Sequence, residues 1–372
     1  MNPDDTYLFS TDSQFEDEVR RIARLLWPTA EFDGASISGG KERDGIFVTE
    51  ECVHIVECTT SRKKDKAEED VKKVFHLARG LRASHPQKVV KGWFVTLQEP
   101  TADQRASVEK HRDLVVAVSY DQLRSKLVDA RTYLELRRKY PFGSVRDPDG
   151  HPIDDLKFIQ LDMVDKVSGE VWPLERILDV AYKPSRIVLL GDYGAGKSTT
   201  MREIFIQLAR RFWNQETRQF PLLLNLRDHH GQVNPVEALE RHARNIGYSS
   251  PSHLVRAWRS GLVILLLDGF DEIATSGWLN QSTKLKDLRY RAMELIRAFS
   301  METPSNSAIV LAGRSHFFDS GQEMNIALSL LNATLLYLDE FTDKQIHLFL
   351  QAQGWTGRIP AWLPAALSCS GT

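Results

Sequence analysis

Nine residues, Gly191-Asp192-Tyr193-Gly194-Ala195-Gly196-Lys197-Ser198-Thr199, follow the apolar run 186–190 and open a segment with a helical pattern. A strand, a glycine-rich turn and a helix, in that order, form a binding site for nucleotide phosphates. In such a turn the backbone N–H groups point inward, Lys197 reaches the terminal phosphates, and the Ser198 hydroxyl can hold magnesium. A chance turn is the alternative, but the complete G-x-x-x-x-G-K-S spacing disfavours it. The stretch therefore predicts a nucleotide-binding domain with a Mg²⁺ site.

A second motif follows the apolar run 263–267, which has the length of a buried strand and ends in Asp268-Gly-Phe-Asp271-Glu272. Acidic groups at the carboxyl end of a parallel strand are typical of a Walker B element. We expect Asp268 to hold magnesium, directly or through a water, and Asp271 or Glu272 to polarise the attacking water. The sequence does not choose between these two, and a solvated loop or a helix N-cap is the alternative role for both.

Two common classes of P-loop protein are disfavoured by their missing motifs. A GTPase would normally carry Asn-Lys-x-Asp after the Walker B, and the sequence has no such string there. A transporter ATPase needs a Ser-Gly-Gly signature between its Walker elements, whereas the triplet 38–40 lies far upstream.

The acidic string 268–272 resembles the extended Walker B of the NACHT family, within the STAND class of signal-transduction ATPases. Three further stretches resemble that family's strand between the Walker elements, its sensor strand and the entry into its small helical domain: 220–227, 307–314 and 337–346. The resemblance covers roughly residues 170–355. It implies ATP and ADP as ligands, slow hydrolysis, a nucleotide-dependent switch and self-association on activation by an unknown trigger.

The resemblance also assigns a role to Arg314, which ends the sensor strand. A guanidinium beside the Walker B strand could contact the γ-phosphate and report its presence. An ordinary exposed arginine at a strand end is the alternative.

The amino-terminal region has its own alternation of helices and strands. Helical periodicity over 15–27 ends at Pro28, and a charged helix is expected over about 63–81. Four β-rich runs complete the pattern: 44–48, 53–57, 89–96 and 114–118. We therefore expect a separate α/β domain here.

This order of elements resembles the restriction-endonuclease-like fold, and specifically the Mrr-like enzymes. The resemblance places Asp44 and Glu57 as ligands of one or two divalent metals, and Glu16 as an additional acid from the first helix. Thr59 stands where the family carries its catalytic lysine, so a lysine from the next helix (Lys63, Lys64 or Lys66) would have to replace it, or the activity is lost. A turn aspartate and an edge-strand glutamate are the alternative roles of Asp44 and Glu57.

The charge near this region favours DNA as its partner. Residues 62–91 contain ten Lys and Arg against four acids, a local surplus that could meet phosphates, although a solvated helix face would look similar. The whole chain has a net charge of -2, which argues against a constitutive nucleic-acid coat protein.

Composition indicates a folded protein of two ordinary domains, with 372 residues and 42% hydrophobic residues. The 3 cysteines lack a Cys-x-x-Cys pair, so neither a disulfide framework nor a zinc knuckle is supported. No signal peptide or membrane-spanning run is visible, and we expect a cytoplasmic location with no membrane partner.

Together these patterns predict an α/β chain with a restriction-endonuclease-like effector domain followed by a P-loop NTPase, a parallel sheet flanked by helices. The expected parts are an effector over 1–140, a linker or hairpin over 141–170, the NTPase over 171–335 and the truncated start of a small helical domain over 336–372. The leading function is a NACHT/STAND ATP switch that controls a metal-dependent DNA nuclease in antiviral defence. A non-catalytic interaction module gated by the ATPase, or an AAA-like restriction motor, is the alternative.

Overall fold

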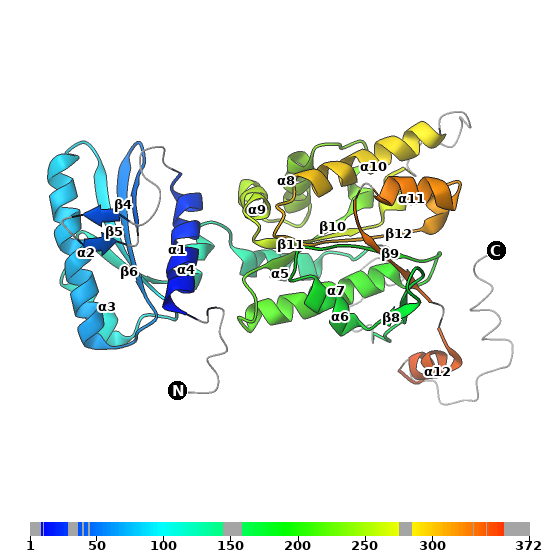
Figure 1. The fold of residues 1–372 in the computed structure, drawn as a ribbon, viewed down its shortest axis with the longest axis horizontal. Helices are drawn as coiled ribbons and strands as arrows, with labels where there is room; N and C mark the ends of the chain where they lie inside the picture. The colour runs from blue at the N-terminus through cyan, green and yellow to red at the C-terminus, as the bar shows by residue number, and fades with distance from the viewer. Residues whose placement is uncertain are drawn as a thin grey trace. The chain divides into compact units, whose positions relative to one another are not determined.

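The structure is a computed structural model, and it describes residues 9, 11–28, 36–38, 41–43, 45–143, 158–274, 285–329, 331–339 and 341–352. The chain divides into two compact units, residues 1–129 and 130–372 (Figure 1). Each unit has its own sheet, and each is described by itself.

The first unit is built on a four-stranded sheet in the order β3-β4-β5-β6. Its strands are β3 (Gly45–Val48), β4 (Cys52–Thr59), β5 (Val89–Thr96) and β6 (Val115–Ser119). The β3/β4 pair is antiparallel, and β4, β5 and β6 run parallel. A separate short hairpin pairs β1 (Ser36–Ser38) with β2 (Lys41–Arg43).

Helices cover both faces of this sheet. They are α1 (Asp12–Leu26), α2 (Lys64–Ser84), α3 (Ala102–Glu109) and α4 (Tyr120–Ser125). Figure 1 shows α2 and α3 on one face, with α1 and α4 on the other. Because side chains alternate along a strand, Val53 and Ile55 pack into the α2 core, while His54 stacks on Trp27 at the end of α1.

The second unit is built on a seven-stranded sheet in the order β10-β11-β12-β9-β13-β7-β8. Five strands are parallel, namely β9 (Arg186–Leu190), β10 (Phe220–Asn225), β11 (Val263–Asp268), β12 (Ile309–Gly313) and β13 (Thr334–Leu338). The antiparallel hairpin of β7 (Met163–Asp165) and β8 (Glu170–Trp172) extends the sheet from β13. Strand β12 therefore lies between the P-loop strand β9 and the Walker B strand β11.

Helices flank this sheet on both sides, as Figure 1 shows, with α6 and α7 on one face and α8 to α11 on the other. The helices are α5 (Ala130–Lys139), α6 (Leu174–Val180), α7 (Lys197–Trp213), α8 (Pro235–Asn245), α9 (Pro251–Arg259), α10 (Leu285–Glu302), α11 (Gly321–Ser329) and α12 (Asp343–Ala352). Short 3₁₀ turns follow three strands: η1 (Leu226–His229), η2 (Phe270–Ala274) and η4 (Ser315–Phe317).

Three boundaries differ from those expected from the sequence. Helix α5 belongs to the second unit rather than to a domain ending at 140, because its Arg137 is fully buried and hydrogen-bonds strand β10. The region expected to be a linker or hairpin, 141–170, includes β7, which forms a hairpin with β8 but also pairs with β13 and so extends the sheet of the second unit. Strand β13 runs to Leu338, beyond the expected end at 335, because Leu336 and Leu338 are buried in the sheet.

Candidate functional site

The glycine-rich turn has the backbone that phosphate binding requires. Gly194 and Gly196 adopt φ values of 77° and 82°, in the left-handed region that glycine occupies without strain. Helix α7 begins at Lys197, with Gly196 as its N-cap. The Lys197 ammonium donates hydrogen bonds to the carbonyl oxygens of Gly191 (2.8 Å) and Asp192 (2.7 Å), so it lies across the turn. Burial lowers its pKa, although nearby carboxylates oppose this effect.

The expected magnesium ligands lie together at the carboxyl edge of the sheet. Asp268 ends β11, is 4% exposed and accepts a hydrogen bond from the Ser198 hydroxyl. Burial raises the pKa of Asp268 to about 6, while the Ser198 hydrogen bond acts in the opposite direction. A hydroxyl and a carboxylate are hard oxygen donors, which suit Mg²⁺. These two residues would therefore hold the metal, whose charge would offset that of the nucleotide phosphates.

Arg314 follows the end of β12 and is joined to the acidic string. Its Nε lies 2.7 Å from Asp271 Oδ2, and its backbone N–H donates to Asp271 Oδ1 at 3.0 Å. The Asp271 side chain is 8% exposed, whereas that of Arg314 is 36% exposed. The guanidinium also lies 5.2 Å from the ring centroid of Tyr193 in the P-loop. Arg314 thus connects the sensor strand to both Walker elements.

Glu272, the last acid of the string, differs in its surroundings. It is half-buried, and burial followed by the charge of Asp271 raises its pKa. A carboxyl with a raised pKa is suited to accept a proton near neutral pH.

A second link, between His316 and Asp192 (3.0 Å), joins the turn after β12 to the P-loop.

Three residues near this site were not singled out from the sequence. Gly143 lies against Ser198 and Asp268. The Oδ1 of Asn225 accepts hydrogen bonds from the Gly143 N–H and from the Arg137 guanidinium. A polar residue ending an apolar strand, as Asn225 does after 220–224, was the available signal. Neither Gly143 nor Arg137 carries a comparable local pattern.

The candidate nuclease residues of the first unit are only partly brought together. Glu57 is half-buried near the carboxyl end of β4, and Thr59, two residues on, is 7% exposed. Lys63 is exposed at the N-cap of α2, and Glu16 is half-buried on α1, where the more deeply buried acid is Glu18. The remaining candidate, Asp44, lies outside the described residues.

A different lysine of α2 lies within the electrostatic reach of Glu57. Burial lowers the pKa of Lys73, but hydrogen bonds to Glu69 and Asp70 and the charges of Asp70 and Glu57 raise it overall. Asp70 is 1% exposed and binds both Lys66 (2.9 Å) and Lys73 (3.2 Å). The sequence signal was a carboxylate on the apolar stripe of the helix, since Asp70 lies one turn from Val74.

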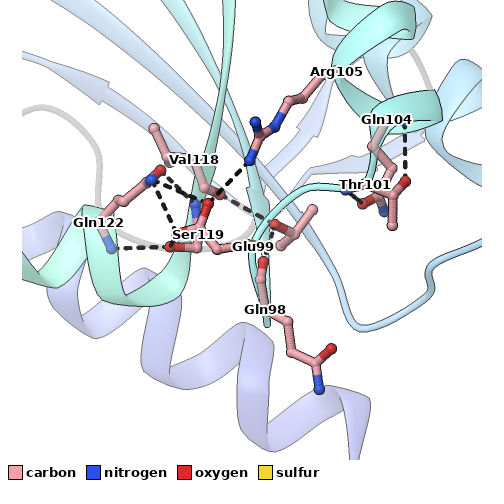
Figure 2. A network of polar contacts seen from close by, with 9 residues as sticks. Gln98, Glu99, Thr101, Gln104, Arg105, Val118, Ser119 and Gln122 are labelled. Carbon is pink, nitrogen blue, oxygen red and sulfur yellow. Dashed lines mark hydrogen bonds and ion pairs between the residues drawn. The ribbon is translucent and has the colours of Figure 1, made fainter.

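Glu99, another acid at the carboxyl edge of the first sheet, takes part in a capping network (Figure 2). It accepts hydrogen bonds from Ser119 Oγ (3.1 Å) and Gln122 Nε2 (3.0 Å), and it pairs with Arg105. Ser119 and Thr101 each form a capping box, at the starts of α4 and α3. The network therefore fixes two helix starts.

Residues 185–350 match the NACHT domain family. This part of the chain is thus a NACHT P-loop NTPase domain, within the region over which the motifs resemble that family. Such a domain implies nucleotide binding, typically with Mg²⁺. The match says nothing about residues 1–129, and a comparison with curated proteins finds no match.

A comparison with solved structures matches the Orc1 protein of Aeropyrum pernix in complex with DNA, at 18% identity and a TM-score of 0.37. That match covers 52% of this chain and 53% of the other. Cdc6p from Pyrobaculum aerophilum matches at 16% identity and a TM-score of 0.29, over 50% and 49%. The E. coli MS115-1 HORMA:CdnC:Trip13 complex matches at 20% identity and a TM-score of 0.28, over 66% and 69%. The chain spans about half the length of the first two.

Two further features are missing from the described residues. No group of three or more His, Cys, Asp or Glu residues is arranged to hold a metal ion among them. Within the same residues, every helix is too short or too polar to cross a membrane.

Proposed function

We propose that this chain is an ATP-dependent switch of the STAND type, which binds ATP with Mg²⁺, hydrolyses it slowly and controls its first unit. The observation that carries the proposal is the pairing of Arg314 with Asp271 beside the P-loop. A guanidinium that already has a carboxylate partner can exchange it for a γ-phosphate, which offers more charge and more acceptor oxygens. The exchange would distinguish ATP from ADP.

The geometry supports a local exchange. The backbone N–H of Arg314 donates to Asp271 Oδ1, so the end of β12 stays attached when the side chain turns away. With ADP the guanidinium remains paired with Asp271. With ATP it turns to the γ-phosphate, and the altered contacts lead to self-association of the chain once a trigger acts.

We assign the role of general base to Glu272 rather than Asp271. Asp271 accepts two hydrogen bonds from Arg314, whereas Glu272 has the raised pKa that suits proton transfer. In this assignment Asp271 is a positioning residue for the arginine, and Asp268 with Ser198 holds the metal.

Titration of the full chain with a fluorescent ATP analogue tests the shared part of the proposal. Lys197→Ala is expected to weaken binding at least tenfold, since the ammonium contacts the terminal phosphates (about 1.4 kcal/mol or more). Lys183→Ala, which changes an exposed lysine of the same unit, is the matched control. Unchanged binding by Lys197→Ala would overturn the proposal.

The rate of ATP turnover and the size of the oligomer distinguish a switch from the motor alternative. A switch retains its nucleotide and associates only with an ATP analogue and trigger, whereas a motor hydrolyses ATP rapidly with DNA and forms rings without a trigger. Light scattering with ADP and with a non-hydrolysable analogue, together with DNA-stimulated phosphate release, distinguishes them.

For the first unit, we propose a metal-dependent DNA nuclease effector in antiviral defence. The supporting observation is that the charge of Glu57 acts on Lys73 of α2, which also pairs with the buried Asp70, so that Lys73 is a better candidate than Lys63 for the missing catalytic lysine. A lysine there could stabilise the developing charge on a phosphate.

Plasmid cleavage with Mg²⁺ and an ATP analogue tests this effector role. Glu57→Gln and Lys73→Ala are expected to abolish cleavage. Glu51→Gln and Lys63→Ala change exposed residues and are the matched controls, which are expected to leave cleavage unchanged. Absence of cleavage by the wild-type chain under every activating condition would favour the alternative, a module that binds DNA or a partner protein without cutting. A mobility-shift titration would then identify DNA binding.

A further inference from the structure

Gly143 lies against the two residues assigned to magnesium. Its φ is +55°, and a Cβ at this position would overlap the Ser198 hydroxyl, 2.8 Å from Ser198 Cβ and 3.0 Å from Asp268 Oδ2. The missing side chain therefore points between the hydroxyl and the carboxylate. Mg²⁺ keeps several water molecules when it binds a protein, so it needs open space around its protein ligands.

Asn225 holds the backbone of Gly143 in this position. It ends β10 and lies beside Asp268 in the register of the parallel pair. Its Oδ1 accepts the Gly143 N–H (3.3 Å), and its Nδ2 donates to the Pro141 carbonyl (2.9 Å). Both contacts join the segment after α5 to the strand next to the Walker B.

Arg137 strengthens the same attachment from inside the unit. It is fully buried and donates to the carbonyls of Leu223 (2.8 Å) and Tyr140 (3.0 Å) and to Asn225 Oδ1 (3.0 Å). Its guanidinium also stacks over the ring of Phe142, 4.2 Å from the centroid. A buried charge with this many oriented acceptors is costly to displace, so the segment is firmly fixed.

We propose that Gly143 shapes the magnesium side of the nucleotide site, and that Asn225 and Arg137 are positioning residues that keep its backbone against Ser198 and Asp268. The inference rests on the proposed nucleotide switch. It explains why a glycine stands at this point: any side chain would occupy the space of the hydrated metal. The consequence is specific, because a nucleotide bound without metal does not need that space.

The test compares the affinity of the full chain for a fluorescent ATP analogue in EDTA and in Mg²⁺. Gly143→Ala is expected to bind as wild type in EDTA but to lose about tenfold or more of the gain that Mg²⁺ provides, the size typical of disturbed metal-site support. Gly169→Ala is the matched control, since Gly169 also has a positive φ (+72°) but nothing within 4 Å of its Cβ position. It is expected to retain the full magnesium gain.

Asn225→Ala gives an independent reading, because it releases Gly143 without adding a side chain. It is expected to lose magnesium gain in the same direction, and it decides the proposal if Gly143→Ala does not fold, as checked by thermal melting. The inference would be overturned if folded Gly143→Ala kept the full increase in nucleotide affinity that Mg²⁺ provides. If Gly143→Ala does not fold, the same result in Asn225→Ala would overturn it. A wild-type chain that binds no nucleotide in either buffer would instead overturn the proposed switch.

Discussion

Arg314 holds Asp271 at two points, its Nε 2.7 Å from Oδ2 and its backbone N–H 3.0 Å from Oδ1. The pair joins the ends of two neighbouring strands, β12 and β11, through residues 43 positions apart. One carboxylate thus accepts a side-chain and a main-chain hydrogen bond from a single residue, which fixes the position of the guanidinium relative to the P-loop. Glu272 is left with a different role in the site.

Substitutions of Glu272 and Asp271 are expected to have different effects on ATP hydrolysis and nucleotide preference. Glu272→Gln should lower ATP hydrolysis by about 10²- to 10⁴-fold with little effect on ATP affinity, because an amide cannot accept the proton. Asp271→Asn should chiefly change the preference for ATP over ADP, since it weakens the anchor of Arg314. Phosphate release and equilibrium titration check both. The reverse pattern would assign the base to Asp271.

Arg314→Lys is expected to reduce the ratio of ATP to ADP affinity by about tenfold. Lysine keeps the charge but lacks the planar fork that pairs with a carboxylate or phosphate. Competition titrations with both nucleotides measure the ratio. Arg218→Lys, a change at a distant arginine before β10, should leave the ratio as in the wild type.

Gly313→Ala is expected to destabilise the second unit by about 1–3 kcal/mol, the usual cost of overpacking. Its Cβ would overlap the ring of Phe270, with Cζ 2.5 Å away, and would push the turn η2 that carries Asp271. Gly321→Ala is the control, because nothing lies within 4 Å of that Cβ position. Urea denaturation compares the variants, and equal midpoints would contradict the packing argument.

The first unit is expected to lose stability on acidification because of His54. Burial, followed by the charge of Lys91, lowers its pKa from 6.5 to about 4, and its Nδ1 accepts a hydrogen bond from Trp93 Nε1 at 3.1 Å. The unfolded chain therefore binds a proton that the folded unit does not. The free energy of unfolding should fall as the pH drops below about 6.5, by up to about 1.4 kcal/mol per pH unit until about pH 4.

Urea denaturation followed by tryptophan fluorescence between pH 7.5 and pH 4.5 measures this loss. His54→Gln should flatten the pH dependence, because an amide does not titrate in this range. Buried His242 in the second unit has a lowered pKa as well, so the comparison is made between variants and not from the wild type alone. An identical pH slope in His54→Gln would rule out this origin.

Local patterns predicted much of the fold. The apolar run 263–267 and the helix after Lys197 appear as β11 and α7, because strand and helix periodicities follow from neighbouring residues. The boundary at 140 could not be placed in this way. Helix α5 has an ordinary amphipathic sequence, and only its packing against β10 assigns it to the second unit.

The candidate site residues likewise include some that local sequence predicts and others that depend on tertiary packing. The P-loop residues are adjacent in sequence, so one motif specifies them. The influence of Glu57 on Lys73 could not be predicted from the residues that begin α2, because Lys73 lies farther along the helix and comes within electrostatic reach of the strand only when the helix packs on the sheet.

The sequence by itself determined that a phosphate-binding turn and an acidic strand end are present, because the spacing of a few adjacent residues is sufficient for each. The tertiary structure alone decided that Arg314 pairs with Asp271 and that Gly143 lies against Ser198 and Asp268. These contacts join residues tens of positions apart, and strand order and helix packing bring them together. No local periodicity carries that information, since it arises from the burial of whole elements against one another.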